Sequence, residues 1–478
     1  MGDATENRGW QSGLPYLILF CAAFALYAKT LSFEFLPSWD DGEYVVNNLY
    51  IRAFTTENLK TIFTGSFFLN YTPLQLLSYM AEYQAWGLDP AGYHMTNVVL
   101  HAVNACLAYS LIGRIVPGRK IAFISALIFA VHPVNIENAA WISERKTLLS
   151  ALFSMLAMMS YIDYSRGRSK GKYLATAVFF SLALLSKPVA VVLPAVLAAY
   201  ELTLGEGLRK KMLALLPLFA ISASLSVITF IAQSSGGSVG ADTLNSKVLF
   251  GTVYPSMLPI FWKYAALILW PLDQSGFYDT TLYNSFLAPP VILAAIAIIA
   301  SWAIVLGYCN KRAKFLFLWF WLWLLPVANI IPLPVFYADR YMYLPAIPFF
   351  VLIGWVAEQA AILSAARQRL IYGATAALFI IFYASITFFR IDVWENDLTF
   401  WTDTAVKSPN LYVSHYNLGY VLEERGMYEE AVREYEIAIR IHPSNEAIDN
   451  QKMARLKRDL KANRPKAPPQ DGSFDKAR

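Results

Sequence analysis

Long apolar segments separated by short polar loops make up most of the chain. A transmembrane helix needs about 20 mostly apolar residues to cross the hydrocarbon core of a bilayer. Eleven segments reach or approach that length: 14–33, 94–113, 120–132, 147–164, 173–186, 188–204, 212–233, 291–309, 315–331, 341–363 and 370–389. The pattern predicts an all-α, polytopic membrane domain with about eleven transmembrane helices at residues 14–390, preceded by a short N-terminal segment, 1–13.

The basic residues of this predicted domain cluster in short loops. Cytoplasmic loops of membrane proteins carry an excess of Lys and Arg. The clusters are Arg114, Arg119 and Lys120; Arg166, Arg168, Lys170 and Lys172; Arg209, Lys210 and Lys211; Lys311, Arg312 and Lys314; and Arg367 and Arg369. These loops are predicted to be cytoplasmic, together with the N-terminus, so the intervening loops and the C-terminal region lie outside.

One apolar run, 248–270, does not fit a simple crossing because Pro255, Pro259 and Lys263 interrupt it. If it crossed alone, the basic cluster at 311–314 would fall on the outer side. The run is therefore predicted to lie in the outer interface or to re-enter it, and whether it crosses is left open.

The first outer loop, 34–93, is too long to be a simple connector. It is acidic, with only Arg52 and Lys60 as bases. Thr72 followed by Pro73 is a helix-start signal, and Gly87 is a stop signal. The loop is predicted to contain a helix lying at the membrane surface.

The composition changes after residue 390. The chain is 57% hydrophobic and 15% charged, whereas soluble domains have about 25% charged residues, and the deficit lies before residue 391. The net charge of +5 comes mostly from the short loops, so no clustered basic face predicts nucleic-acid binding. Cys21, Cys106 and Cys309 lie in or at the end of apolar segments and form no CxxC motif, so neither a zinc site nor a disulfide framework is predicted.

Residues 412–445 match the helix–turn–helix pattern of tetratricopeptide repeats, with Gly419 in the first helix and Pro443 ending the second. Residues 391–460 are therefore predicted to form a soluble repeat domain, and 461–478 a disordered tail. The repeat domain could bind a partner peptide or could be a small structural cap on the membrane domain. The second alternative arises because repeat arrays normally need at least three units for stability.

Ionisable residues near the hydrocarbon are costly and usually serve a site, and most of those in this chain fall on the predicted outer side. They are Asp40, Asp41, Glu137, Glu144, Arg145, Lys146, Lys187, Asp339 and Arg340. A carboxylate can take a proton from an acceptor hydroxyl, and cationic side chains can hold a leaving phosphate. This set suits sugar transfer from an anionic lipid.

Simpler readings of these residues remain open. The carboxylates Glu137 and Glu144 could serve solely as salt-bridge partners of Arg145 or Lys146, without a part in the chemistry. The cations Lys187 and Arg340 could extend to lipid headgroups, and Asp339 could pair with Arg340. The histidines His94, His101 and His132 lie near outer helix ends, where a packing role competes with that of a ligand or base.

Several motifs occur in one order along the chain: WDD at 39–41, NYTPLQLLSY, YHMTNVVLHAVNA, HPVNIENAAWISERKTLLS, LLSKPVAVVLP, ADRYMYLP and WENDLTFW, followed by the repeat pattern. The ordered set resembles the bacterial form of the transmembrane and tetratricopeptide-repeat-containing O-mannosyltransferase family, which belongs to the GT-C glycosyltransferase superfamily. The resemblance covers roughly residues 14–450.

The resemblance implies an inverting transfer of a sugar, mannose being one candidate, from a polyprenyl-phosphate donor to a hydroxyl. The superfamily places its catalytic acid in the first outer loop. Asp40 aligns with that acid and is predicted to be the base, while Asp41 stands where Glu is common. The predicted phosphate ligands are Arg145, Lys146, Lys187 and Arg340, and the predicted supporting residues are Glu137, Glu144, His94, His132 and Asp339.

Two features qualify the predicted site. Many relatives carry Arg where this chain has Thr72, so the loop is not predicted to supply a cation there. The outward carboxylates are compatible with a hard divalent cation bound through oxygens, but their spacing specifies no metal site, and no other cofactor is predicted.

The predicted function is a protein O-mannosyltransferase-like enzyme of a bacterial inner membrane, acting on protein Ser/Thr at the periplasmic side. The expected partners are a polyprenyl-phosphate sugar, membrane lipids and a protein or glycan acceptor, with a further protein partner through the repeats. The same fold acting on an envelope lipid or surface glycan is an alternative, and a non-enzymatic membrane scaffold is another. Sugar, acceptor, prenyl chain and oligomeric state are not specified by the sequence.

Overall fold

A computed structural model describes residues 13–67, 70–167, 169–205, 208–235, 248–330, 333, 335–362 and 366–462. The predicted N-terminal segment up to residue 12 and most of the predicted tail, from residue 463, lie outside these residues. By their internal contacts the residues divide into two compact units, Met1–Phe400 and Trp401–Arg478. The division falls after Phe400, about ten residues beyond the predicted boundary at 390/391.

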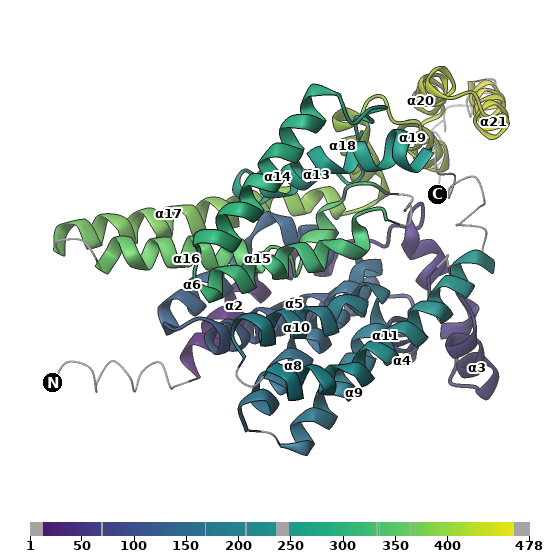
Figure 1. The fold of residues 1–478 in the computed structure, drawn as a ribbon. Coiled ribbons are helices and arrows are strands. Elements are labelled where there is room, and N and C mark those ends of the chain that lie inside the picture. Colours follow the sequence, from purple (N-terminus) through teal and green to yellow (C-terminus); the bar gives the residue numbers. More distant parts are fainter. Residues whose placement is uncertain are drawn as a thin grey trace, which may run out of the picture. The chain divides into compact units, whose positions relative to one another are not determined.

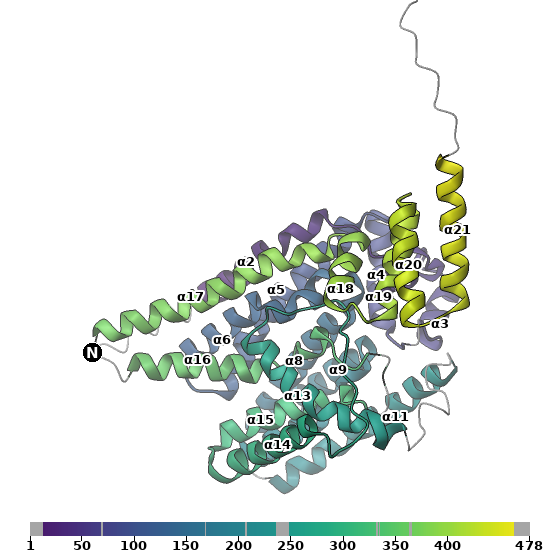
Figure 2. The same cartoon turned by 90° about the horizontal axis from the view of Figure 1, so that it is seen from above.

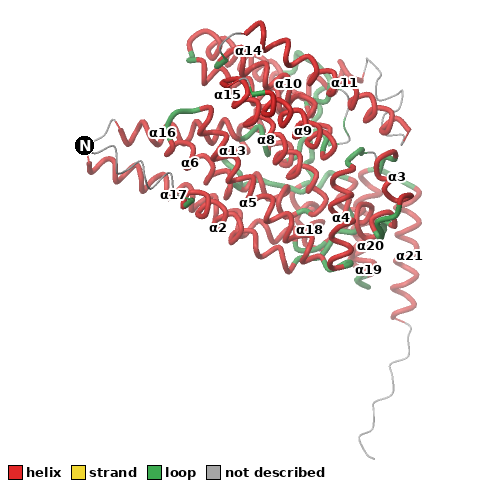
Figure 3. Tube along the Cα trace, turned by 90° about the horizontal axis from the view of Figure 1, so that it is seen from below, coloured by secondary structure: helices red, strands yellow, loops and turns green. Residues whose placement is uncertain are grey.

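Helices joined by loops make up the described part of the chain (Figure 3). Its only β-structure is an isolated bridge between Phe67 and Asn70. The helices of the first unit, labelled in Figure 1, are α2 (Leu14–Tyr27), α3 (Thr56–Thr64), α4 (Pro73–Trp86), α5 (Pro90–Ile115), α6 (Arg119–Val131), α7 (Ile136–Ala140), α8 (Arg145–Gly167), α9 (Lys170–Ser186), α10 (Leu193–Thr203), α11 (Leu208–Ser235), α13 (Tyr254–Leu269), α14 (Pro289–Tyr308), α15 (Lys311–Leu324), α16 (Ile347–Ile362) and α17 (Ala366–Arg390), and α18 (Asp397–Lys407) follows across the division. Each of the eleven predicted apolar segments overlaps one of these helices.

Local sequence signals account for several helix ends. Pro occupies the first helical turn of α4, α5 and α14, where its missing N–H costs no hydrogen bond. The Asp89 side chain caps α5 by accepting a hydrogen bond from the Ala91 N–H at 3.0 Å, and Asn310 caps α15 through the Ala313 N–H at 3.0 Å. These caps fix where the long helices begin.

Helix α5 lies inside the first unit, in contact with α2, α6 and α8 (Figure 2). Its residues Ala102, Ala105 and Ala108 are completely buried, and small side chains let neighbouring helices approach closely. In the same view α2 and α17 lie along one side of the bundle, with α14 and α15 along the other. The core of the unit is therefore built around α5, α6 and α8.

Among the described residues, six helical segments are long and apolar enough to cross a membrane: Leu14–Ser32, Pro90–Ile115, Ile142–Gly167, Lys211–Thr229, Pro289–Tyr308 and Gly373–Trp394. The bent pair Arg119–Val131 and Pro133–Ala140 would add a seventh. The most apolar 18-residue window of Pro289–Tyr308 is only 11% buried, so most of its surface is free to face lipid. The chain is thus a multi-pass membrane protein. The remaining predicted crossings coincide with shorter helices such as α9 and α15, and the total of eleven stays a prediction.

The first long loop forms a folded layer rather than an extended connector. It contains α3, α4 and short helical turns, and its apolar side chains pack around Tyr44, Ile62 and Tyr79. Helix α4 begins at Pro73 and ends before Gly87, whose φ of +60° stops it. The predicted loop helix is therefore confirmed, whereas its predicted position at the membrane surface is not tested.

The second unit contains the end of α18 and the helices α19 (Tyr412–Glu424), α20 (Tyr428–Ile441) and α21 (Asn445–Ala462). A three-residue turn joins α19 to α20, and Gly426 in that turn has a φ of +73°. The buried Gly419 of α19 faces the Tyr435 ring of α20: a Cβ at Gly419 would lie 2.8 Å from a ring carbon. A helix hairpin was predicted at 412–445. Its membership in the tetratricopeptide family remains a prediction.

Because the Gly419 position leaves no room for a side chain, we expect Gly419→Val to destabilise the α19–α20 hairpin by about 1–3 kcal/mol. Hydrogen exchange of the α19 and α20 amides in the full-length protein should become faster. The control is Glu424→Ala on the exposed face of α19, which should leave exchange unchanged. Equal protection of the two variants would contradict the close packing.

Candidate functional site

The predicted acidic and basic site residues of the first unit come from five separate segments. Asp40 and Asp41 follow the loop after α2, and Glu137 lies on α7. Glu144, Arg145 and Lys146 form the turn that begins α8, and Lys187 ends α9. Asp339 and Arg340 form a 3₁₀ turn before α16. Lys187 has an extended backbone (φ −153°, ψ 128°), because the residue before a proline disfavours the helical conformation.

Asp41 is fully buried and ties its loop to the turn before α8. Its Oδ1 accepts hydrogen bonds from the Ser143 N–H at 3.0 Å and from the Ser143 hydroxyl, and its Oδ2 accepts one from the Leu36 N–H at 3.0 Å. Burial raises the pKa of the Asp41 carboxyl to about 7, although the hydrogen bonds from Ser143 and Leu36 act to lower it. Ser143, which the sequence analysis did not single out, is thus the anchor of this loop.

Asp40 faces the cationic side of the site instead. Its Oδ2 lies 3.4 Å from the Lys146 ammonium nitrogen, and its side chain is 14% exposed. The following Gly42 makes this turn possible, since a Cβ there would lie 2.4 Å from the Pro37 carbonyl oxygen. Adjacent aspartates therefore have different surroundings, one sequestered and one accessible.

Glu144 is the centre of a buried ion cluster. Its Oε2 lies 3.0 Å from the Lys187 nitrogen, and its Oε1 lies 3.5 Å from Lys146 and 3.7 Å from the Arg340 Nε. The Thr147 hydroxyl donates to Glu144 and receives a hydrogen bond from Lys187 at 2.7 Å. Three of the four predicted phosphate ligands therefore converge on one carboxylate.

Glu137 and Asp339 hold the Arg340 turn from different sides. Glu137 accepts hydrogen bonds from the Arg340 backbone N–H at 2.8 Å and from its guanidinium. Asp339 accepts from the Gln274 amide and the Tyr278 hydroxyl, each at 2.6 Å, so the two neighbours do not pair with each other. Burial, and then the charge of Glu137, raises the pKa of Asp339 to about 7.

The fourth predicted phosphate ligand, Arg145, points away from this cluster. Its guanidinium donates to Glu82, to the Asn97 Oδ1 at 2.9 Å and to the Tyr93 carbonyl at 2.7 Å. These contacts join α4, α5 and α8, and the side chain is completely buried. The structure therefore gives Arg145 a position between helices rather than in the cationic group.

The predicted histidines make contacts within the helix bundle. In His132, one ring nitrogen accepts from the Val134 N–H at 3.1 Å, and the other lies 2.9 Å from the Ile268 carbonyl. His101 lies between the Tyr343 hydroxyl at 2.8 Å and the Ala130 carbonyl at 3.1 Å. His94 lies 3.4 Å from the Glu34 carbonyl. These contacts favour the packing role that the sequence left open.

An aromatic stack borders the ion cluster. The Trp141 ring stacks on Trp39 and on Trp394, with centroids 5.7 Å apart in each case. Lys146 and Arg340 lie over Trp141, 5.6 and 5.7 Å from its ring centroid, close enough for cation–π attraction. Trp141 therefore borders both cations, a role that its place between IENAA and ISERK did not reveal.

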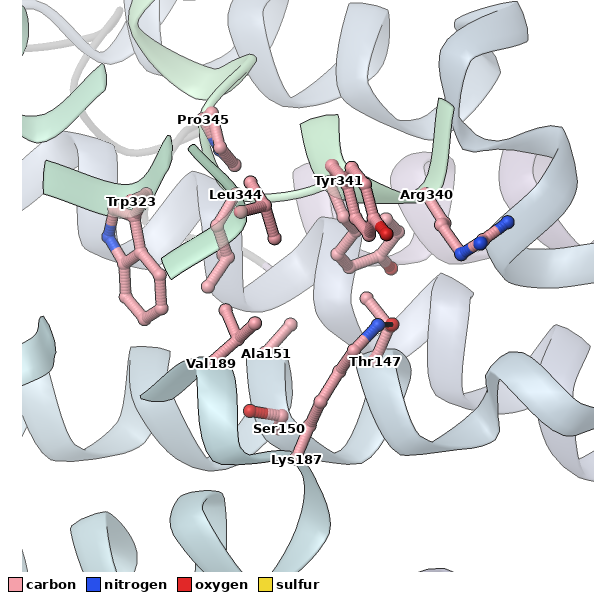
Figure 4. A pocket seen from close by; sticks show the side chains of 12 residues that line it. Thr147, Ser150, Ala151, Lys187, Val189, Trp323, Arg340, Tyr341, Leu344 and Pro345 are labelled. Carbon is pink, nitrogen blue, oxygen red and sulfur yellow. Dashed lines mark hydrogen bonds between the residues drawn. The ribbon is translucent and has the colours of Figure 1, made fainter. Parts of the chain in front are cut away.

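A small cavity of about 30 Å³ lies beside the cluster. Figure 4 shows Lys187 reaching toward Thr147, with Tyr341 and Arg340 on the other side of the cavity. Among the described residues no group of three or more His, Cys, Asp or Glu side chains is arranged to hold a metal ion. The polar lining instead offers ammonium, guanidinium and hydroxyl donors, which suit an anion.

A much larger apolar groove, of about 970 Å³, lies along α15 and α16. Helix α15 and the residues just before α16 also contribute to the lining of the small cavity. The cavity is lined by Trp323 of α15 and by Pro345 just before α16, and the groove by Trp321 and Pro348. The groove continues along α13, α14, α15 and α16 as far as Arg312 and Glu358. Its length and lining are compatible with a hydrocarbon chain.

No protein-family model matches the chain. Protein O-mannosyl-transferase F38B6.6 from Caenorhabditis elegans is 25% identical to it over 476 residues, covering 93% of this chain and 65% of that protein. Protein O-mannosyl-transferase TMTC3 from Mus musculus is 23% identical over 467 residues, covering 85% and 49%. The chain therefore spans about half to two thirds of the length of these curated relatives.

A relative matched over a shorter stretch carries the same name. Protein O-mannosyl-transferase Tmtc1 from Drosophila melanogaster is 30% identical over 177 residues, covering 35% of this chain and 20% of that protein. Among solved structures, ArnT from Cupriavidus metallidurans bound to undecaprenyl phosphate gives a TM-score of 0.45 at 13% identity, covering 94% of this chain and 79% of that one. The predicted family resemblance is thus confirmed to the extent that these curated relatives are named protein O-mannosyl-transferases.

Proposed function

We propose that this chain is a membrane glycosyltransferase that moves a sugar from a polyprenyl-phosphate donor to the hydroxyl of an acceptor. The observation that carries the proposal is the accessible Asp40 carboxylate beside the buried cations Lys146, Lys187 and Arg340. One group can accept a proton, and the others can stabilise a phosphate. The name of the curated relatives supports a protein hydroxyl as acceptor and mannose as the sugar.

In the proposed reaction Asp40 acts as the general base. The acceptor oxygen attacks C1 of the sugar, its proton passes to the Asp40 carboxylate, and the bond from C1 to the phosphate oxygen breaks. The departing polyprenyl phosphate carries the negative charge, which Lys146, Lys187 and Arg340 stabilise. A single displacement of this kind inverts the configuration at C1.

Asp41 is less suited to be the base, because both of its carboxylate oxygens already accept hydrogen bonds. Its role in the proposal is to position the loop. By holding the loop against Ser143, it fixes where the neighbouring Asp40 meets Lys146.

The proposal places the reaction on the non-cytoplasmic side of a bacterial inner membrane, and the charges along three helices support that side. Helix α6 begins at Arg119 and ends beside His132 and Glu137. Helix α8 begins at the site and ends near Arg166, and α9 begins at Lys170 and ends at Lys187. The site and the basic loops therefore occupy opposite ends of these helices, as the positive-inside rule requires.

The apolar groove supplies a place for the prenyl chain of the donor. It follows α15 and α16 from the level of the cationic cavity toward the far end of the bundle. Burial of hydrocarbon there would add affinity in proportion to the apolar area covered. The second helical unit, with its hairpin, is proposed to contact the protein acceptor or a partner.

Asp40→Asn keeps the size of the side chain but removes the proton acceptor. We expect transfer from a polyprenyl-phosphate sugar to fall by at least about 100-fold, while the melting temperature stays close to that of the unchanged protein. The matched control is Glu43→Gln, an exposed acid in the same loop, which should retain activity. Full activity of Asp40→Asn would exclude the proposed base.

The raised pKa of Asp41 predicts a pH effect on stability. The carboxyl pKa of about 7 in the folded protein lies above the unfolded value of about 3.9, so the protonated form favours folding. This contribution is complete below about pH 4 and is lost as the pH rises through 7. Asp41→Asn should therefore flatten the decline in melting temperature between pH 4 and 8. The same decline in Asp41→Asn and in the Glu43→Gln control would contradict this assignment.

A bulky residue in the groove should discriminate between donors by chain length. Ser301 lines the groove, whereas the adjacent Ala300 is exposed and does not. We expect Ser301→Trp to raise the KM for an undecaprenyl-phosphate sugar about tenfold, with little change for a short-chain donor, and Ala300→Trp to change neither. Equal KM values for both donors in Ser301→Trp would show that the prenyl chain lies elsewhere.

A further inference from the structure

Glu144 has an unusual position for a residue of a phosphate-binding site. Its carboxylate is buried, with a side-chain exposure of 1%, and it contacts Lys146, Lys187 and Arg340 at once. These are the cations that the proposed function assigns to the donor phosphate. An anion supplied by the protein itself therefore lies among the groups that must receive the anion of the substrate.

The three contacts differ in strength. Lys187 lies at hydrogen-bonding distance from Glu144, 3.0 Å, whereas Lys146 and Arg340 are 3.5 and 3.7 Å away. Charge-assisted N–H···O⁻ hydrogen bonds are normally about 2.7–2.9 Å long. Lys146 and Arg340 are thus incompletely engaged with Glu144 and can turn toward another oxygen without losing a short hydrogen bond to it.

The other anions near these cations have partners of their own. Glu137 receives both the backbone N–H and the guanidinium of Arg340, and Asp40 is the proposed base. Carboxylate and phosphate oxygens accept the same charge-assisted hydrogen bonds. Glu144 is therefore the described carboxylate that competes most directly with a phosphate for all three cations.

The adjoining cavity agrees with such competition. It is lined by Thr147, Lys187, Arg340 and Tyr341, and its volume of about 30 Å³ is two to three times the roughly 10–15 Å³ that one water molecule needs. A phosphate group cannot enter without a shift of the surrounding side chains. Displacement of the Lys187 ammonium from Glu144 and Thr147 would open this space and present the ammonium to the phosphate.

We propose that Glu144 is an internal competing anion, which holds the three cations when the donor is absent and weakens the binding of the polyprenyl phosphate that remains after transfer. The inference rests on the proposed function and concerns the release of its lipid product. Without Glu144 the buried cations would be uncompensated, which is costly, and would hold the phosphate tightly. Product release limits many enzymes, so a built-in competitor favours turnover.

A purely orienting role of Glu144 predicts the opposite change in the affinity for phosphate. If Glu144 served only to orient the cations, its neutralisation would weaken phosphate binding. Glu144→Gln retains the size and an acceptor oxygen for Thr147 and removes the charge. We expect this variant of the full-length protein, in detergent or nanodiscs, to bind undecaprenyl phosphate at least tenfold more tightly and to show stronger product inhibition of transfer.

Two controls isolate the charge of Glu144. Neutral undecaprenol should bind both proteins equally, because it lacks the phosphate. Glu201→Gln neutralises another buried acid, which lies 3.5 Å from Lys211, and should leave the affinity for undecaprenyl phosphate unchanged. If Glu201→Gln also binds tenfold more tightly, a general charge effect replaces the proposed competition.

The outcomes separate this inference from the proposed function. If the unchanged protein binds undecaprenyl phosphate no better than undecaprenol, the proposed donor is wrong and the inference fails with it. If it binds the phosphate and Glu144→Gln binds it equally or more weakly, only the inference is overturned. Should Glu144→Gln not fold, the charge-balanced pair Glu144→Gln/Lys187→Gln decides: affinity within a few-fold of the unchanged protein supports competition, and a loss beyond tenfold refutes it.

Discussion

Charged side chains at the end of an apolar helix bundle are stable only if they compensate one another. Each ion removed from water carries a desolvation cost of several kcal/mol, which a well-placed partner can offset. In this protein the compensation is shared: Glu144 contacts Lys146, Lys187 and Arg340, and Glu137 and Asp40 complete the charge balance. The positions of the first loop, the α7–α8 turn, the end of α9 and the turn before α16 all depend on this cluster.

The aspartates around this cluster differ in how far their carboxylates are already engaged by the protein. Asp41 is sequestered by Ser143 and Leu36, and Asp339 is occupied by Gln274 and Tyr278. Asp40 keeps some exposure beside an ammonium group. A site that must deprotonate a hydroxyl and retain a phosphate needs this inequality, because a carboxylate whose two oxygens already accept hydrogen bonds from the protein is a weaker base.

Much of this arrangement could be predicted from the sequence. The apolar segments specified the helices, since each is bounded by loops with turn or cap residues, and Thr72-Pro73 and Gly87 marked the ends of α4. The sequence could not specify the direction of neighbouring side chains. Glu144, Arg145 and Lys146 are consecutive, and successive residues of a helical turn point about 100° apart. Arg145 is therefore directed to Glu82, while its neighbours enter the cluster. Nor could it show that Ser143 would meet Asp41, 102 residues away, because that contact depends on how two distant segments pack.

The stack of Trp39, Trp141 and Trp394 has a consequence for biosynthesis. Trp39 lies near the beginning of the first unit, Trp141 about a third of the way along it and Trp394 close to its end. Arg340 lies over the central ring, Trp141. Chains emerge from the ribosome from the N-terminus onward, so Trp39 and Trp141 are synthesised long before Trp394 completes the stack. A truncated chain lacking residue 394 would therefore leave Trp141 without the second of its two stacked tryptophan rings.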